Sequence, residues 1–167
     1  MTVYDMHHRV ELRARPDGSQ GVFSARNFKA GDVLSVGYIG KIVKSNERNA
    51  VQIGKDQFVI LAGLINCVNH SCSPNCGVRP NLNRGFDLVA MHDGGRNDEV
   101  TYDYATQNYL LEYMPDRCTC GSPECRGKIT GWCDLSRDKK TGYKKFVAPY
   151  LIEIDEDGVF TRADLTQ

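Results

Sequence analysis

Three cysteines in the last third of the chain have the type and spacing of metal ligands. Cys118, Cys120 and Cys125 offer three thiolates within one tight loop, and Gly121 and Pro123 supply turns that let the sulfurs converge. Three soft thiolate ligands suit zinc. The alternative is a set of reduced surface cysteines without metal, which would be prone to oxidation at such close spacing.

A closed structural zinc site needs a fourth ligand. The candidates by residue type are the histidines and the other cysteines, Cys67, Cys72, Cys76 and Cys133. Cys133 is the local candidate, whereas Cys72 would tie the loop to a distant segment and contribute more tertiary order. Spacing alone does not choose among them.

A second segment with polar chemistry, residues 69–75, has the sequence NHSCSPN and follows an apolar stretch. Taken alone, it is a polar loop beside a core, and its His70 is typical of a satisfied structural histidine. Further along, EVTYDY at 99–104 contains two tyrosines, which strand propensity by itself interprets as half-buried β residues.

Short strands must position these segments. The alternation in RVELRAR at 9–15 predicts a strand with Val10, Leu12 and Ala14 on one face, and Pro16-Asp17-Gly18 then turns the chain. Further strands are expected at 21–25 (GVFSA), 33–36 (VLSV), 51–53, 58–60, 86–90 and 100–104. The segments 51–53 and 58–60 form a predicted hairpin about Gly54-Lys55-Asp56, and the whole pattern predicts a mostly β fold.

The end of the chain has a different pattern. Residues 107–114 form the best helical stretch of the core region. In 131–167, a basic stretch (RDKKTGYKK) precedes Tyr150 to Ile154, a DEDG turn and Val159-Phe160, which together predict a terminal hairpin. The basic stretch is typical of a solvated face, with a docking surface as the sharper alternative.

Composition limits the function classes. The 167 residues are 41% hydrophobic and 25% charged, which suits one domain, and 21 basic residues balance 21 acidic ones. A net charge of zero predicts no broad electrostatic attraction to nucleic acid or to an anionic membrane. No run approaches the roughly 18 apolar residues that span a bilayer, and Met1 to Val10 lack a signal core. We therefore expect a soluble intracellular protein, in which the seven clustered cysteines favour metal over disulfides.

Several motifs, in order and with matching spacing, resemble the SET-domain lysine methyltransferases that carry a post-SET zinc loop. NHSCSPN, EVTYDY and CTCGSPECRGKI at 118–129 are the principal matches. GVFSARNFKAGDVL resembles the opening strand and turn of the family, and Tyr38-Ile39-Gly40 its Tyr-x-Gly motif. VAMHDGGRNDEVTYDY has the length of the family segment that ends at the catalytic tyrosine. The resemblance covers residues 9–131.

The resemblance implies a β-clip-like SET fold of several small twisted sheets with short helices. A C-terminal strand segment would thread beneath the NHSC loop as a pseudoknot. The implied organisation is a SET domain at 9–108, a post-SET zinc loop at 114–130 and a C-terminal extension with a hairpin at 131–167. In such enzymes the NHSC cysteine completes the zinc site, so Cys72 is the implied fourth ligand, together with Cys118, Cys120 and Cys125.

The resemblance also implies roles in methyl transfer from S-adenosylmethionine to lysine. Tyr104 matches the catalytic tyrosine of the family, and Tyr38 matches a residue that lines the lysine channel. Tyr102 stands at the family's Phe/Tyr position, where a tyrosine resembles enzymes that stop at one or two methyl groups. Cofactor-binding positions are matched by Gln20, Gly21, Asn69, His70, Tyr104 and, from the zinc loop, Ile129.

Three features depart from the family pattern. Ser19 stands in place of the first glycine of a Gly-x-Gly pair, and Asn66 in place of an arginine before NHSC. Only residues 41–68 separate Tyr-x-Gly from NHSC, so the insert that shapes one wall of the substrate groove is minimal. A protein segment can still bind there as an added strand, whereas a shallow groove also admits a smaller amine.

Three hypotheses for function follow. The leading one is a protein-lysine methyltransferase whose substrate is a histone or another lysine-bearing protein. The second is a small-molecule amine N-methyltransferase on the same fold. The third is a non-catalytic interaction module stabilised by zinc. We expect neither direct nucleic-acid binding nor a membrane partner in any of them.

Overall fold

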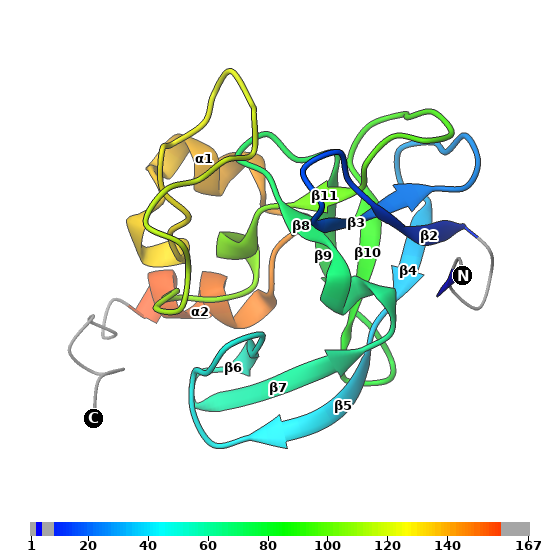
Figure 1. Cartoon of the computed structure of the whole chain (residues 1–167). Coiled ribbons are helices and arrows are strands. Elements are labelled where there is room, and N and C mark those ends of the chain that lie inside the picture. The colour runs from blue at the N-terminus through cyan, green and yellow to red at the C-terminus, as the bar shows by residue number, and fades with distance from the viewer. Residues whose placement is uncertain (1–2, 5–8, 158–167) are drawn as a thin grey trace.

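A computed structural model describes residues 3–4 and 9–157. Figure 1 shows small β-sheets on one side of the molecule and two short helices on the other. The first sheet has the strand order β1-β2-β3, with β1 (Val3–Tyr4), β2 (Val10–Ala14) and β3 (Gln20–Ser24) antiparallel. The turn between β2 and β3 contains Gly18 at φ 81°, and the Asp17 carboxylate accepts hydrogen bonds from the backbone N–H and the hydroxyl of Ser19.

Two further three-stranded sheets complete the antiparallel part. One has the order β4-β10-β9, formed by β4 (Val33–Val36), β10 (Phe86–Ala90) and β9 (Cys76–Pro80). The other has the order β5-β7-β6, formed by β5 (Tyr38–Val43), β7 (Gln57–Ala62) and β6 (Val51–Gly54). The mostly β fold and the β6–β7 hairpin are thus confirmed, and β5 and β9 are strands that the sequence pattern did not predict.

The fourth sheet is a parallel pair of two-residue strands, β8 (Asn69–His70) and β11 (Thr101–Tyr102). Asn69 faces Thr101 in this pair and His70 faces Tyr102. The NHSC motif and the YDY motif, residues 102–104, therefore lie side by side, although about thirty residues separate them in the sequence. These are the segments that the resemblance assigns to the pseudoknot.

The helical stretch predicted at 107–114 is wrong. A 3-10 turn, η2 (Tyr104–Thr106), ends before it, and residues 107–114 follow an irregular path. Tertiary hydrogen bonds replace the helical ones: the Tyr109 N–H donates to Gln52 Oε1, and the Asn108 side chain bonds the backbone of Gln52 and Ala50. Buried amide side chains hold this segment, so its helix propensity is overridden.

The predicted terminal hairpin is also wrong. After the 3-10 turn η3 (Trp132–Asp134), the chain forms α1 (Arg137–Gly142) and α2 (Pro149–Asp157). Pro149 occupies the first helical position, where its missing N–H costs nothing. Tyr150, Leu151 and Ile154 are buried at helical spacing. Val159 and Phe160, the second half of the predicted hairpin, lie outside the described residues.

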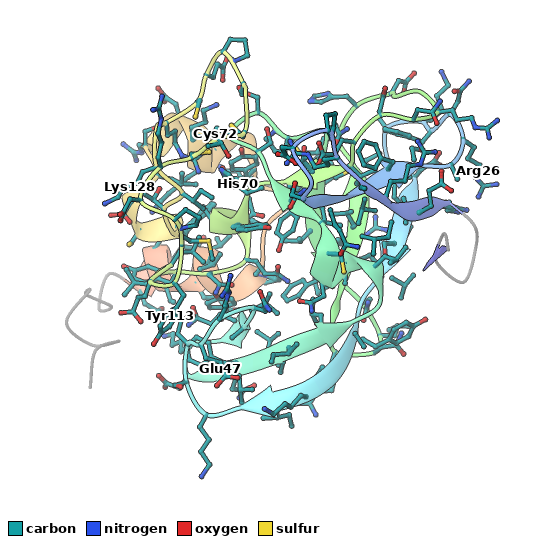
Figure 2. The ribbon with its side chains drawn as sticks, in the orientation of Figure 1. Arg26, Glu47, His70, Cys72, Tyr113 and Lys128 are labelled. Atoms are coloured by element: carbon teal, nitrogen blue, oxygen red, sulfur yellow. The ribbon has the colours of Figure 1, made fainter. Side chains whose placement is uncertain are left out.

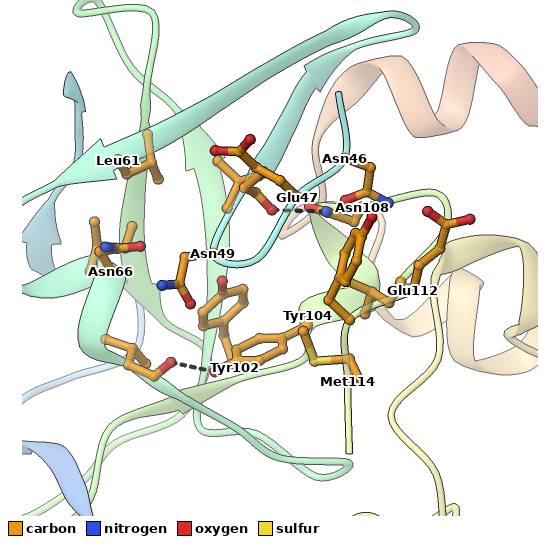
Figure 3. A pocket seen from close by; sticks show the side chains of 16 residues that line it. Asn46, Glu47, Asn49, Leu61, Asn66, Tyr102, Tyr104, Asn108, Glu112 and Met114 are labelled. Carbon is orange, nitrogen blue, oxygen red and sulfur yellow. Dashed lines mark hydrogen bonds between the residues drawn. The ribbon is translucent and has the colours of Figure 1, made fainter. Parts of the chain in front are cut away.

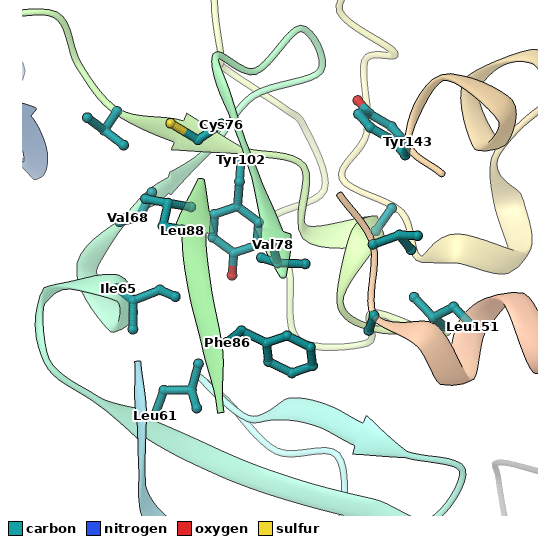
Figure 4. Packing of buried hydrophobic residues seen from close by; sticks show 14 of the residues in the cluster. Leu61, Ile65, Val68, Cys76, Val78, Phe86, Leu88, Tyr102, Tyr143 and Leu151 are labelled. Atoms are coloured by element: carbon teal, nitrogen blue, oxygen red, sulfur yellow. The ribbon is translucent and has the colours of Figure 1, made fainter. Parts of the chain in front are cut away.

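One core joins the sheets to the C-terminal helices. Buried side chains form a continuous cluster from Val10 in β2 to Ile154 in α2, and Trp132 and Leu151 in it are fully buried. Figure 4 shows Tyr102 in this packing, with Val68, Leu88, Val78 and Phe86 around it. Among the described residues, no helix has the length and apolar character needed to cross a membrane.

Candidate active site and cysteine cluster

Four cysteine sulfurs converge where the NHSC motif meets the loop at 118–125. The Sγ atoms of Cys72, Cys118, Cys120 and Cys125 all lie within 4.8 Å of one another, and those of Cys72 and Cys118 are 3.9 Å apart. Four thiolates around a tetrahedral zinc with bonds of about 2.3 Å lie about 3.8 Å apart. The donor set and its spacing therefore fit one structural zinc ion.

The surroundings of the sulfurs also fit metal ligation. Backbone N–H groups point at two of them, from Arg126 to Cys72 Sγ and from Gly127 to Cys125 Sγ, both at 3.4 Å. Burial raises the pKa of the Cys72 thiol and raises that of Cys118 to about 12, whereas at Cys120 burial is outweighed by hydrogen bonds, which lower the pKa to about 6. A bound cation would stabilise the thiolate forms of Cys72 and Cys118. The other cysteines, Cys67, Cys76 and Cys133, are not in the cluster.

His70 connects this cluster to Tyr104, and Figure 2 shows His70 near Cys72. Its Nδ1 accepts a hydrogen bond from the Tyr104 backbone N–H at 3.3 Å, and its Nε2 lies 3.3 Å from Cys72 Sγ. Burial lowers the pKa of His70 to about 4, so the ring is neutral at pH 7. Because Nδ1 accepts from Tyr104, the neutral ring carries its proton on Nε2, and this N–H donates a hydrogen bond to the Cys72 sulfur.

Tyr104 has a fixed hydroxyl and two aromatic neighbours. The hydroxyl donates to the Val68 carbonyl at 2.9 Å, and the ring lies 5.3 Å from that of His70 and 5.0 Å from that of Tyr102. Burial raises the pKa of Tyr104 to about 12. The residue is therefore a neutral hydroxyl with an oriented oxygen at physiological pH and is no general base.

A first cavity, of about 610 Å³ including its open mouth, lies between the β5-β7-β6 sheet and residues 108–114. Figure 3 shows Tyr102 and Tyr104 in its wall with Asn49, Asn66 and Glu112. Its other lining residues combine apolar side chains with amides and a second carboxylate, Glu47. The cavity therefore combines carboxylate and amide groups with a wall of tyrosines.

A second cavity, of about 1240 Å³ including its open mouth, lies on the other side of Tyr104. Four of the residues predicted to bind a cofactor line it together: Asn69, His70, Tyr104 and Ile129. The cysteine loop contributes Cys118, Thr119 and Cys120. The two cavities share the residues Asn49, Tyr104, Tyr113 and Met114, so Tyr104 lies at their junction.

Gln20 and Gly21, the other predicted cofactor positions, lie beside the second cavity. The Asn69 side-chain amide donates to the Gln20 carbonyl at 2.8 Å and to Glu99 Oε1 at 2.9 Å. A Cβ added at Gly21 would lie 2.7 Å from that same Glu99 oxygen, so a larger residue there would displace the Glu99 side chain. Glu99 also pairs with Arg15 at 3.4 Å, and both side chains line the cavity, although neither residue was a predicted site residue.

Asp103 is a buried carboxylate on which three segments converge. It accepts two hydrogen bonds from the Arg126 guanidinium, at 2.6 and 2.9 Å, and one from the Tyr143 hydroxyl at 3.1 Å. Asp103 is fully buried, Arg126 belongs to the cysteine loop and Tyr143 follows α1. Its place inside the YDY motif was the only signal in the sequence for this role.

Tyr38, the third tyrosine of the predicted site, begins β5 and pairs with Ala62 in β7. It is not among the residues that line either cavity. Instead, Tyr113 from the irregular segment lines both cavities, in addition to Tyr102 and Tyr104 in the first and Tyr104 in the second. The role of Tyr38 stays a prediction.

A model of the SET domain matches residues 19–105, just over half of the chain. The chain belongs to the SET-domain family. Its mostly β architecture agrees with that fold, and the four-cysteine cluster that includes residues after the SET domain is consistent with a post-SET zinc site.

Among curated proteins, the chain is similar to histone-lysine N-methyltransferases described as H3 lysine-4 specific. It is 29% identical over 128 residues to that of Aspergillus fumigatus and 30% identical over 130 residues to that of Schizosaccharomyces pombe. These matches cover 64% and 65% of this chain, but only 10% and 14% of the relatives. The SET protein thus spans a small part of each relative's length.

A solved structure gives a similar result. KRYPTONITE in complex with mCHH DNA, an H3(1-15) peptide and SAH matches with a TM-score of 0.54 and 27% identity. The match covers 71% of this chain and 29% of that one. The fold similarity therefore extends over most of the SET protein.

Proposed function

We propose that this SET protein is an S-adenosylmethionine-dependent N-methyltransferase that acts on lysine side chains of proteins. The observation that carries the proposal is the junction of two cavities at Tyr104, one lined by the NHSC motif and the cysteine loop, the other by tyrosines and amides. A donor on one side and an acceptor on the other would meet at this residue. Histone-lysine methyltransferases among the relatives agree with it.

The first cavity suits the acceptor. None of its lining residues is Lys or Arg, whereas Glu47 and Glu112 offer carboxylates to an incoming ammonium group. Buried residues of the same wall, Tyr102, Ile65 and Val68, would offer the amine apolar or aromatic contacts. Desolvation there lowers the pKa of a lysine, so the amine reaches the reacting position in its neutral, nucleophilic form.

The protein then has mainly to align the reactants and exclude water. S-adenosylmethionine, when bound in the second cavity, supplies a methyl carbon whose bond to sulfur breaks as the amine nitrogen forms its new bond to that carbon. Tyr104 presents an oxygen to the junction and, with its pKa raised to about 12 by burial, keeps its proton. The proton lost by the amine therefore passes to water and not to Tyr104.

The cysteine cluster has a structural part in this proposal. Cys72, Cys118, Cys120 and Cys125 would hold one zinc ion, which adds no chemistry to methyl transfer. Its effect is to fix Cys118, Thr119, Cys120 and Ile129 as a wall of the second cavity. Because His70 contacts both Cys72 and Tyr104, the metal site also supports the catalytic position.

The substrate that we propose is a lysine-bearing protein, with histone H3 the first to test because the relatives' names specify it. Tyr102 favours a product with one or two methyl groups. A second candidate is a smaller amine, because the insert between the Tyr-x-Gly and NHSC motifs, residues 41–68, is short for the family.

The acceptor is tested by incubating the protein with isotope-labelled S-adenosylmethionine and core histones, other lysine-rich proteins or free amines, followed by mass spectrometry. We expect label on lysine side chains of a protein and none when that lysine is replaced by arginine. Label on free amines alone would replace the proposal by the second candidate. Folded, zinc-loaded protein that binds no S-adenosylmethionine in calorimetry would instead indicate an interaction module.

A further inference from the structure

The hydroxyl of Tyr102 is bound by a residue that no SET motif of this chain includes. It donates to Gln107 Oε1 at 2.9 Å, and both side chains are buried, with Gln107 1% exposed. The other end of this amide, Nε2, has no hydrogen-bond partner among the described residues. A buried amide with one unpaired donor lowers the stability of the fold. In the part of the chain that the structure describes, the hydrogen bond to Tyr102 is the one contact of this side chain that could explain why a glutamine stands here.

The C-terminal segment holds Gln107 in place. The Tyr150 hydroxyl in α2 donates to the Gln107 carbonyl at 2.6 Å, the Ala148 N–H to the Thr106 carbonyl at 2.8 Å, and the Trp132 N–H to the Asn108 carbonyl at 2.9 Å. A Cβ at Gly131 would collide with the Tyr109 carbonyl, so glycine permits this close approach. Residues 131–151 thus fix the backbone on both sides of Gln107.

This bond determines what Tyr102 offers to the first cavity, in whose wall it lies. Because its proton is directed to Gln107, the oxygen can act toward the cavity only as an acceptor. An amine with an N–H group can donate to it, whereas a methyl group in the same place cannot. Each methyl transfer forms an N–C bond, breaks the C–S bond of the sulfonium donor and removes one N–H, so the fit to Tyr102 worsens with every round.

We propose that Gln107 is a specificity-determining residue, which positions the Tyr102 hydroxyl as an acceptor and thereby limits the number of methyl groups added to the amine. This inference rests on the proposed methyl transfer to lysine. Gln107 touches no reactant in it and acts through Tyr102. Residues 131–151 contribute to the same effect, because they hold the backbone around Gln107 and Gln107 in turn orients the Tyr102 hydroxyl.

The test compares Gln107→Leu, Tyr102→Phe and the double variant in the full chain, with mass spectrometry of the substrate lysine at matched conversion. We expect Gln107→Leu to raise the ratio of higher to lower methylation states about fivefold, the factor that corresponds to one hydrogen bond of about 1 kcal/mol. Tyr102→Phe should shift the ratio in the same direction, and the double variant should add nothing to Tyr102→Phe alone. Gln107→Glu, which keeps an acceptor oxygen, should restore the wild-type ratio.

Ser24→Ala is the control. Ser24 in β3 of the first sheet is also a fully buried polar residue, and its hydroxyl donates to the Arg26 carbonyl. Its loss costs stability, but the ratio of methylation states should remain that of the wild type. A ratio that shifts equally in both variants would overturn the inference, because a general loosening would then explain it.

Failure of this inference is distinguishable from failure of the proposed function. An active Gln107→Leu with the wild-type ratio overturns the inference alone, whereas wild-type protein without transfer to any protein lysine overturns both. If Gln107→Leu does not fold, Tyr150→Phe weakens the hold on Gln107 and should shift the ratio in the same direction. An unchanged ratio in that variant counts against the inference.

Discussion

Asp103 illustrates at the residue scale how the site is held together. Its carboxylate is fully buried and accepts from Arg126 in the cysteine loop and from Tyr143 after α1. A buried charge is stable only while its partners remain, and removing one partner costs more than the pair contributes. This ion pair therefore contributes to the stability of the cysteine loop next to the second cavity, in addition to the cysteine cluster.

Arg126→Met should lower the free energy of unfolding by about 3 kcal/mol, because it leaves the buried Asp103 carboxylate without its charged partner. Urea denaturation followed by circular dichroism measures this loss. Arg117→Met is the matched control, since Arg117 is exposed in the same stretch and its replacement should change stability by less than about 0.5 kcal/mol. Equal effects of the two substitutions would contradict the role of the Asp103 pair.

At the scale of elements, the cysteine loop and the β8–β11 pair act as one unit. Cys72 lies two residues after the end of β8, and His70 within β8 bonds the backbone of Tyr104 just beyond β11. The loop at 118–129 meets this pair at the cysteine cluster and also lines the second cavity. Metal loading and cofactor binding are therefore expected to be coupled.

Removing zinc with a chelator should weaken S-adenosylmethionine binding, because Cys118, Thr119, Cys120 and Ile129 then lose their fixed positions in the cavity wall. Calorimetry on zinc-loaded and zinc-free protein measures the difference. Cys72→Ser should lose zinc and cofactor affinity together, whereas Cys133→Ser, outside the cluster, should keep both. Zinc retained by Cys72→Ser and lost by Cys133→Ser would reverse the ligand assignment.

The elements also show which parts of the fold a local pattern can predict. Strands β2, β3, β4, β6, β7 and β10 follow alternating or β-branched runs bounded by turn residues, and the sequence predicted them. The helix at 107–114 failed because buried amides of Gln52 and Asn108 satisfy that backbone from outside. The hairpin at the C-terminus failed because burial at helical spacing, with Pro149 at the first position, outweighed a strand-like composition.

At the scale of the whole molecule, the C-terminal segment is part of the core and of the site. Trp132, Leu151 and Ile154 pack with the strands, and Tyr143 and Tyr150 bond residues of the YDY region. The motif resemblance ended at residue 131 and gave this segment no role. Contacts such as Tyr150 with Gln107 join residues about forty positions apart, which no local pattern encodes.

The candidate site was predictable to the extent that motifs carry it. The cysteines lie together, and Asn69, His70, Tyr104 and Ile129 line one cavity, because these residues belong to ordered motifs. Arg15, Glu99 and Tyr113 were missed because their side chains reach the cavities only through tertiary packing. Tyr38 lies in a motif but is not among the residues that line either cavity.

The most direct measurement of the central claim is methyl transfer by Tyr104→Phe, with cofactor binding measured on the same preparation. We expect transfer to a protein lysine to fall by about 100-fold or more, because the oxygen at the junction that aligns the reactants is lost. Calorimetric binding of S-adenosylmethionine should change little, because the rest of the second cavity remains. Wild-type rates in Tyr104→Phe would contradict the account.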